Sequence, residues 1–202
     1  ADKLLPPLVA ELRKSVKTWR ENKYEGASET SQALLRWWFE EPHPILNRDG
    51  TSSNFKYYFA QREALETIIY LYEVVAIKDK YDLMRFDASG YITADLFDEH
   101  WKRFVIKMAT GSGKTKVLSL ALAWSFFHKL YEPNSTLARN FLVIAPNIIV
   151  LDRIYKDFEG LKIFLKDDPI LPDNGYYERN WRDDFQLDLH IQDDVKIVRQ
   201  YG

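Results

Sequence analysis

The chain has 202 residues, of which 46% are hydrophobic and 29% charged, as is typical of a soluble globular protein with one sizeable domain. It has no cysteine, which excludes disulfide bridges and thiolate metal sites, and none of its apolar runs approaches the roughly 20 residues that span a bilayer. We therefore expect no membrane partner and a cytoplasmic location. The net charge is −2, but residues 101–160 carry nine Lys or Arg against four Asp or Glu, which suits a polyanionic ligand.

Residues 1–55 are predicted to form a helical amino-terminal region. Apolar residues recur at helical spacing over 4–22, which predicts an amphipathic helix. A second helix is expected over 29–40, with Ser28 as its N-cap and prolines after its end. The stretch 47–54 is rich in turn-forming residues and is predicted to be a loop.

A phosphate-binding motif dominates the middle of the chain. A third helix is predicted over 58–77. A strand is then expected over 103–108, followed by a turn and a helix over 114–130. Residues 108–115 read Met-Ala-Thr-Gly-Ser-Gly-Lys-Thr. A strand, a glycine-rich turn, Gly-Lys-Thr and a helix, in this order, are the context that a phosphate-binding loop (P-loop) requires.

The residue types of this loop suit a nucleoside triphosphate. Gly111 and Gly113 have no Cβ, so the backbone can turn successive N–H groups inward towards phosphates. Lys114 can place its ammonium on the β- and γ-phosphates, and the Thr115 hydroxyl can join the shell of Mg²⁺. Met108 stands where the general pattern has its first glycine. The structural alternative is a glycine-rich turn that binds nothing.

The segment after the P-loop unit favours an α/β fold. The apolar run 141–145 predicts a strand buried on both faces, and a helix is expected from Asn147 to about Phe158. The resulting β-α-β-α order predicts a parallel sheet. Residues 186–191 and 195–199 are candidates for short strands.

A glutamine about fifty residues before Lys114 is a candidate base reader. The amide of Gln61 offers one acceptor and two donors, which match N6 and N7 of adenine, and the ring of Tyr57 or Tyr58 could stack on the base. Taken by itself, Gln61 fits better as a solvent-facing residue beside core aromatic residues, and it is the P-loop at this spacing that favours the base-reading role.

These motifs resemble those of one family. Gln-Arg-Glu-Ala at the start of a helix, the 108–115 motif, and Phe-Leu-Val-Ile-Ala-Pro-Asn from residue 141 occur in the order found in the first motor domain of superfamily 2 helicases and translocases. The chain is most similar to the motor (Res) subunit of type III restriction enzymes and related DEAD/DEAH-type ATPases, over residues 28–158. The resemblance implies a P-loop RecA-like α/β domain over 56–202, with a parallel sheet and helices on both faces.

The resemblance also implies a function. It implies a DNA-dependent ATPase, a helicase or restriction translocase, that uses ATP and Mg²⁺, with DNA and a modification subunit as partners. Lys114 is then the catalytic cation, Thr115 the Mg²⁺ ligand, and Gln61 with Tyr57 or Tyr58 the adenine site. The nucleotide-binding loop comprises Thr110, Gly111, Ser112, Gly113, Lys114 and Thr115.

A possible nucleic-acid contact follows the 141–145 run. Pro146, Asn147 and Arg153 resemble the family motif that touches the nucleic-acid backbone. The structural alternative for these residues is a strand-to-helix turn with a surface arginine.

One expected motif is missing. The family needs an Asp-Glu pair at the end of a buried strand, and Asp193-Asp194 is a poor match because the residues before it alternate between apolar and polar. We therefore expect an amino-terminal fragment that ends before the acidic motif and hydrolyses ATP slowly or not at all by itself. A P-loop phosphotransferase acting on a small molecule and a non-hydrolysing regulatory module are the alternative functions. The four histidines show no zinc-ligand spacing.

Overall fold

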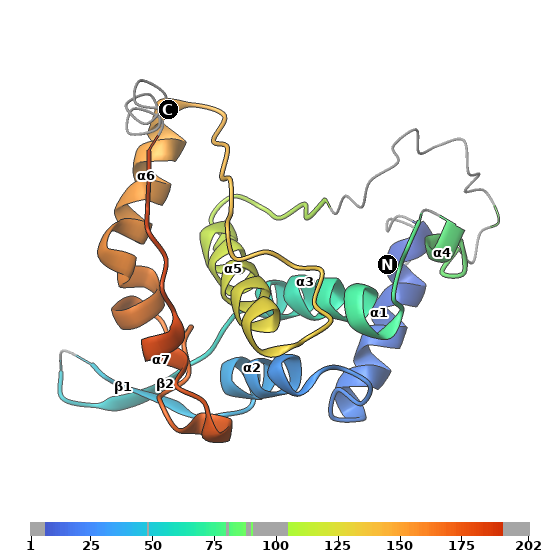
Figure 1. The fold of residues 1–202 in the computed structure, drawn as a ribbon, viewed down its shortest axis with the longest axis horizontal. Coiled ribbons are helices and arrows are strands. Elements are labelled where there is room, and N and C mark those ends of the chain that lie inside the picture. The colour runs from blue at the N-terminus through green and yellow to red at the C-terminus, as the bar shows by residue number, and fades with distance from the viewer. Residues whose placement is uncertain (1–6, 48, 80, 88–89, 91–104, 192–202) are drawn as a thin grey trace.

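The structure is a computed structural model that describes residues 7–47, 49–79, 81–87, 90 and 105–191. Most of its elements are helices, as Figure 1 shows. In chain order they are α1 (Pro7–Glu21), α2 (Glu29–Phe39), β1 (His43–Leu46), β2 (Ser52–Phe55), α3 (Phe59–Ile69), the π-helix η2 (Tyr70–Val74), α4 (Tyr81–Met84), α5 (Lys114–Tyr131), α6 (Ile148–Phe158), the 3-10 helix η4 (Glu159–Leu161), the π-helix η5 (Ile163–Asp167), the 3-10 helix η6 (Tyr176–Glu178) and α7 (Trp181–Asp184).

The predicted helices are confirmed at close to their expected bounds. Ser28 caps α2 as predicted, because its Oγ accepts a hydrogen bond from the backbone N–H of Ser31 at 3.2 Å. The helix expected over 58–77 begins at Phe59, but its regular part ends at Ile69 and continues as the π-helix η2.

The hydrophobic core is built around α5. This helix packs against α2 and α3, and the three lie together at the centre of Figure 1. The segment that follows α6 supplies aromatic side chains that pack on α5: the rings of Phe127 and Trp181 lie 4.8 Å apart and those of Phe126 and Phe185 lie 5.0 Å apart. Burying a large apolar side chain stabilises a fold by about 1.5–3 kcal/mol. The largest fully buried side chains are Trp38, Trp181, Tyr24, Phe127, Phe164, Leu34, Leu35, Leu65, Ile69, Leu120, Ile170 and Leu171.

A buried carboxylate attaches α1 to α3. Glu66 is fully buried, and it accepts hydrogen bonds from Arg20 Nε at 2.9 Å, Arg62 Nε at 2.7 Å and the Tyr24 hydroxyl at 2.8 Å. Burial of the Tyr24 phenol and the nearby charge of Glu66 raise the pKa of Tyr24, so it stays a neutral donor. Charge-assisted hydrogen bonds of this kind are stronger than neutral ones and fix the position of α1.

The predicted parallel sheet is absent from the part of the chain that the structure describes. Residues 105–108, 141–145 and 186–191 are not strands, and Leu142 and Ile144 are 85% and 82% exposed rather than buried on both faces. The physical reason is that an extended segment becomes a strand only when a neighbouring strand pairs with its N–H and C=O groups. The remaining parts of these predictions, 103–104 and 195–199, lie outside the described residues.

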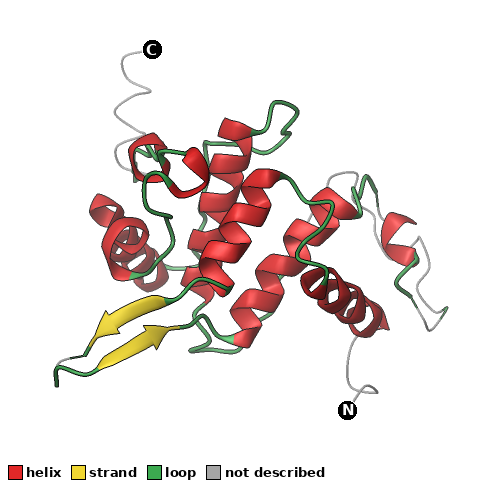
Figure 2. Ribbon diagram, turned by 90° about the horizontal axis from the view of Figure 1, so that it is seen from below, coloured by secondary structure: helices red, strands yellow, loops and turns green. Residues whose placement is uncertain are grey.

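The described residues contain one β-hairpin, and its second strand lies largely within the stretch 47–54 that was predicted to be a loop. β1 and β2 pair antiparallel, with His43 opposite Phe55 and Leu46 opposite Ser52. The hairpin projects from the helices, as Figure 2 shows. The overlooked signal was the Asp49-Gly50 pair, a dipeptide that favours hairpin turns and lies between the two strands.

Candidate nucleotide-binding site

The P-loop is a turn that leads directly into α5. Gly111 and Gly113 both have φ of +79°, a left-handed conformation that glycine adopts without strain. The Ser112 N–H closes the turn by donating to the Ala109 carbonyl at 3.3 Å, and Gly113 is the residue before the first turn of α5. The first N–H groups of an 18-residue helix and its positive dipole end therefore lie at the end of the loop, where they favour an anion.

Lys114 is folded back over the loop. Its side chain is exposed, and its Nζ donates to the Ala109 carbonyl at 2.9 Å and to the Met108 carbonyl at 3.3 Å. These neutral acceptors can be exchanged for phosphate oxygens, which bind an ammonium more strongly because they are charged. Thr115 follows in the first turn of α5 and is half-buried.

Gln61 contacts the P-loop, although the two are 51 residues apart in sequence. Its Oε1 accepts from the Tyr58 N–H at 2.8 Å, and its Nε2 donates to the Ser112 carbonyl at 3.1 Å. The side chain is only 2% exposed. A Cβ on Gly113 would lie 2.2 Å from Nε2 of Gln61, so a larger residue at position 113 would displace the Gln61 amide in addition to straining the positive φ.

The two tyrosines predicted near the base lie in different environments. Tyr57 packs edge-on against Phe39 and Phe55, with ring centroids 5.8 Å and 4.8 Å away. Its hydroxyl is buried without a hydrogen-bond partner among the described residues, and burial, together with the charge of Asp168, raises its pKa. Tyr58 is 68% exposed and is free to offer its ring face, as is Phe59, which the sequence interpretation did not select.

A second lysine of α5 is engaged elsewhere. Nζ of Lys116 lies 2.5 Å from Oδ1 of Asp168 and 4.8 Å from the centre of the Phe55 ring. Asp168 is 52 residues further along the chain, so no local sequence signal could have identified this pair. The pair attaches the first turn of α5 to the segment that follows η5.

Of the residues predicted to touch nucleic acid, Pro146 and Asn147 directly precede α6 and Arg153 lies in its middle. Pro146, Asn147 and Arg153 are all exposed. Oδ1 of Asn147 accepts from the Val150 N–H at 3.0 Å, so Asn147 is the N-cap of α6. Asn147 thus has a structural role that would be needed with or without a nucleic acid.

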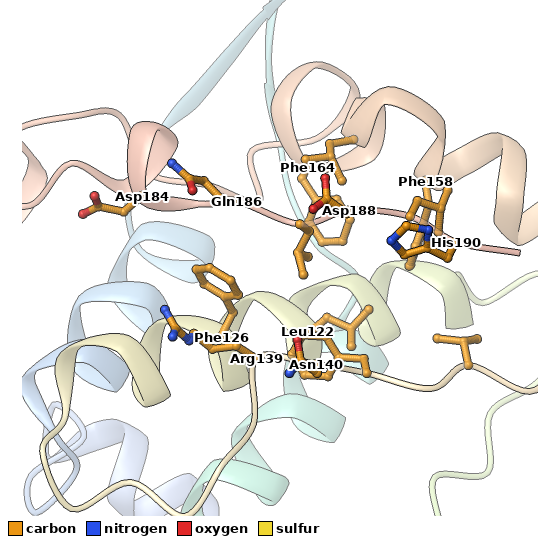
Figure 3. A pocket seen from close by; sticks show the side chains of 15 residues that line it. Leu122, Phe126, Arg139, Asn140, Phe158, Phe164, Asp184, Gln186, Asp188 and His190 are labelled. Carbon is orange, nitrogen blue, oxygen red and sulfur yellow. The ribbon is translucent and has the colours of Figure 1, made fainter. Parts of the chain in front are cut away.

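A cavity of about 540 Å³ lies between α5 and the segment 184–190. Figure 3 shows Leu122 and Phe126 of α5 on one side and Gln186, Asp188 and His190 on the other. Its lining contains no P-loop residue. Asp193 and Asp194 lie outside the described residues, and within those residues no cluster of His, Asp or Glu could hold a metal ion.

Comparisons with known proteins identify the family. A family model described as "Type III restriction enzyme, res subunit" matches residues 54–183, well over half of the chain and including both Gln61 and the P-loop. No curated protein and no solved structure matches the chain significantly. In the part of the chain that the structure describes, no helix is both long enough and apolar enough to cross a membrane. The chain therefore belongs to the res subunit family of type III restriction enzymes, whose motor domain is of the superfamily 2 helicase type.

Proposed function

We propose that this chain binds ATP with Mg²⁺ and forms part of the ATPase motor of a larger DNA-dependent enzyme. The observation that supports the proposal most directly is the contact of Gln61 with the P-loop, at 3.1 Å from Nε2 to the Ser112 carbonyl. It brings a group able to read adenine next to a loop able to hold phosphates. Family membership favours this function over phosphotransfer to a small molecule.

Each residue of the loop has a distinct task in this proposal. The N–H groups at the start of α5 bind phosphate oxygens, and Lys114 neutralises the charge that develops on the phosphoryl group in transfer. The Thr115 hydroxyl is an oxygen donor of the kind that Mg²⁺ prefers, so Thr115 would hold the ion together with phosphate oxygens. Bound Mg²⁺ would supply charge neutralisation at the β- and γ-phosphates. Of the two tyrosines, Tyr58 is the better stacking candidate because its ring is exposed.

Turnover by this chain is expected to be slow. Among the described residues, no hydrogen bond or ion pair joins a carboxylate to Lys114 or Thr115, so none of these residues holds an acidic group against the P-loop to orient an attacking water. Phosphate release well below about 1 s⁻¹, the lower limit of typical enzymes, is the expected result. Faster release that Asp193→Ala abolishes would show that the chain holds its own acidic motif.

The sheet and the DNA contact are further parts of the proposal. The apolar side chains of Val105, Leu142 and Ile144 are more than 80% exposed, and apolar runs of this kind suit the strands of a parallel sheet that is covered on both faces. We propose that DNA binds near Arg153, and a modification subunit is a proposed partner. DNA affinity measured by fluorescence anisotropy should fall in Arg153→Ala, and an unchanged affinity would exclude Arg153 from the interface.

A pair of lysine variants tests nucleotide binding. Lys114→Ala should weaken the affinity for Mg-ATP by about 2–3 kcal/mol, the value of a charged hydrogen bond, in calorimetric titrations. Lys116→Ala is the matched control, because it removes the same charge from the same helical turn but from a side chain already bound by Asp168. Equal affinity of wild type and Lys114→Ala would refute the proposal.

A further inference from the structure

A buried polar cluster holds the end of α5 opposite to the P-loop. The side chains of His128 and Glu73 are only 8% and 6% exposed, and His128 Nε2 lies 3.3 Å from Glu73 Oε1. The other ring nitrogen of His128, Nδ1, lies 2.7 Å from the Ser135 hydroxyl. The rings of Tyr72 and Trp124 pack edge-on against the imidazole, with centroids 5.6 Å and 5.9 Å away. Both ring nitrogens of His128 thus have polar partners, and two aromatic rings pack against the imidazole.

Glu73 joins three helical elements. Besides contacting His128 of α5, its carboxylate accepts from the Ser28 N–H at 2.5 Å and from the Ser31 hydroxyl, at the start of α2. Burial raises the pKa of Glu73, but the hydrogen bonds from His128, Ser28 and Ser31 outweigh burial and hold its pKa below the usual value. A charged, fully bonded carboxylate therefore connects η2 to both α2 and α5.

The chain reaches this point through an irregular turn. α3 changes at Tyr70 into the π-helix η2, which contains Glu73. A π-turn accommodates one residue more than an α-turn, so it rotates the side chains that follow it around the helix axis. Such turns are frequent at functional sites, and this one places Tyr72 and Glu73 against His128.

The helix that carries Glu73 at its end carries Gln61 at its beginning. α3 with η2 thus makes polar contacts with α5 and its preceding loop at both ends, through Gln61 to Ser112 and through Glu73 to His128. Between these ends the core is apolar, with Leu65, Ile69 and Leu120 fully buried in one cluster. Apolar contacts are non-directional, whereas buried polar pairs are best known for fixing the register of packed helices.

We propose that the Glu73–His128 pair is a positioning device that sets the axial register of α5 against α3, and with it the placement of Lys114 relative to Gln61. The inference rests on the proposed function, since only a ligand with both a base and phosphates contacts both residues. A rigid 18-residue helix spans about 27 Å and transmits a shift from one end to the other. Loss of the pair therefore weakens binding of the complete nucleotide and spares binding of phosphates alone.

Binding of two ligands distinguishes a positioning role of the Glu73–His128 pair from a role in stability alone. Calorimetry of the 202-residue chain with Mg-ATP and with inorganic tripolyphosphate gives the ratio of the two affinities. In Glu73→Gln and in His128→Leu, ATP affinity should fall at least about fivefold, the lower end of typical coupling between sites, while tripolyphosphate affinity stays within about twofold. In His128→Gln the wild-type ratio should be retained, because the glutamine amide can donate to Glu73 in place of Nε2.

Tyr131→Phe is the matched control. It removes the hydrogen bond from Tyr131 to Asp184, 2.7 Å long, at the same end of α5 without touching η2, and it should leave the ratio unchanged. Circular dichroism confirms that each variant is folded. A variant that loses affinity for both ligands equally, or for neither, refutes the positioning role. Failure of the wild type to bind ATP refutes the proposed function itself, and the inference with it.

Discussion

The two ends of α5 differ in their exposure and in their chemical partners. At its start Lys114 is exposed and donates to the backbone carbonyls of Met108 and Ala109 in its own loop. At its other end His128 is buried, with Glu73 and Ser135 as partners and two aromatic rings around it. We call the exposed end with Lys114 the open end of α5 and the buried end with His128 its closed end.

The difference shows how Lys114 can have contacts that are easily exchanged while the helix that carries it is held in position by contacts at its other end. A residue that must exchange its partners for a ligand cannot also anchor the helix that carries it. The anchoring contacts are instead made by residues at the far end, such as Glu73 and His128, which no ligand needs to reach. The comparison predicts that removing a buried side chain at the His128 end costs stability, whereas removing the exposed side chain of Lys114 at the other end costs little stability.

The largest effect is expected from Glu73→Ala. This change leaves His128, Ser28 and Ser31 without their common acceptor, and each buried donor left without a partner costs about 1–3 kcal/mol in the free energy of unfolding. Lys114→Ala, at the exposed end, should change that free energy by no more than about 0.5 kcal/mol. Urea unfolding of both variants measures the contrast, and similar losses in the two would contradict it.

Two glycine variants sharpen the comparison within the open end. Ala at either Gly111 or Gly113 must adopt the left-handed conformation, at a cost of about 1–2 kcal/mol in stability. Gly113→Ala should cost about 1 kcal/mol more for each hydrogen bond that Gln61 gives up in moving away, whereas no atom of the described residues lies within 4 Å of a Cβ at Gly111. Thermal unfolding compares the two, and equal costs would show that Gln61 is not held against the loop.

Gln61→Ala tests whether the same amide reads the base. Guanine presents an O6 acceptor where adenine has an N6 donor, so the wild type should prefer ATP to GTP by about 1–3 kcal/mol. Because the Gln61 amide must first release Ser112, the lower part of that range is expected. Competition binding gives the preference. If GTP binds as tightly as ATP, and Gln61→Ala changes neither affinity, the amide has no part in base recognition.

The smallest effect is a pH dependence at the closed end. The pKa of Glu73 is lower in the folded protein than its usual value of 4.5, so the stability that its charge provides is complete above that value. It is lost as the pH falls through the lower folded-state pKa. The difference in unfolding free energy between wild type and Glu73→Gln should therefore shrink as the pH falls below 4.5. A difference that grows on acidification would contradict the assignment.

Local patterns were sufficient for the helices. The spacing of apolar residues, the Ser28 cap and the glycines before Lys114 are signals carried within a few residues, and α1, α2, α3, α5 and α6 form near the predicted positions. The positive φ of Gly111 and Gly113 was predictable for the same reason, since only glycine adopts it freely. Strands could not be predicted in this way, because a strand exists only with its neighbour, and the apolar run 141–145 has none among the described residues.

By itself the sequence determined a glycine-rich loop with Lys114 and Thr115 at the start of a helix, and it singled out Gln61 as a candidate partner of that loop, because the signal lies in the residue types of each short motif. Only the tertiary structure decided what surrounds them. It buried Tyr57 against Phe39 and Phe55, bound Lys116 to Asp168, and brought Glu73 to His128 through a π-turn. These contacts join residues far apart in the chain, and their energies depend on burial and geometry that arise only when the helices pack.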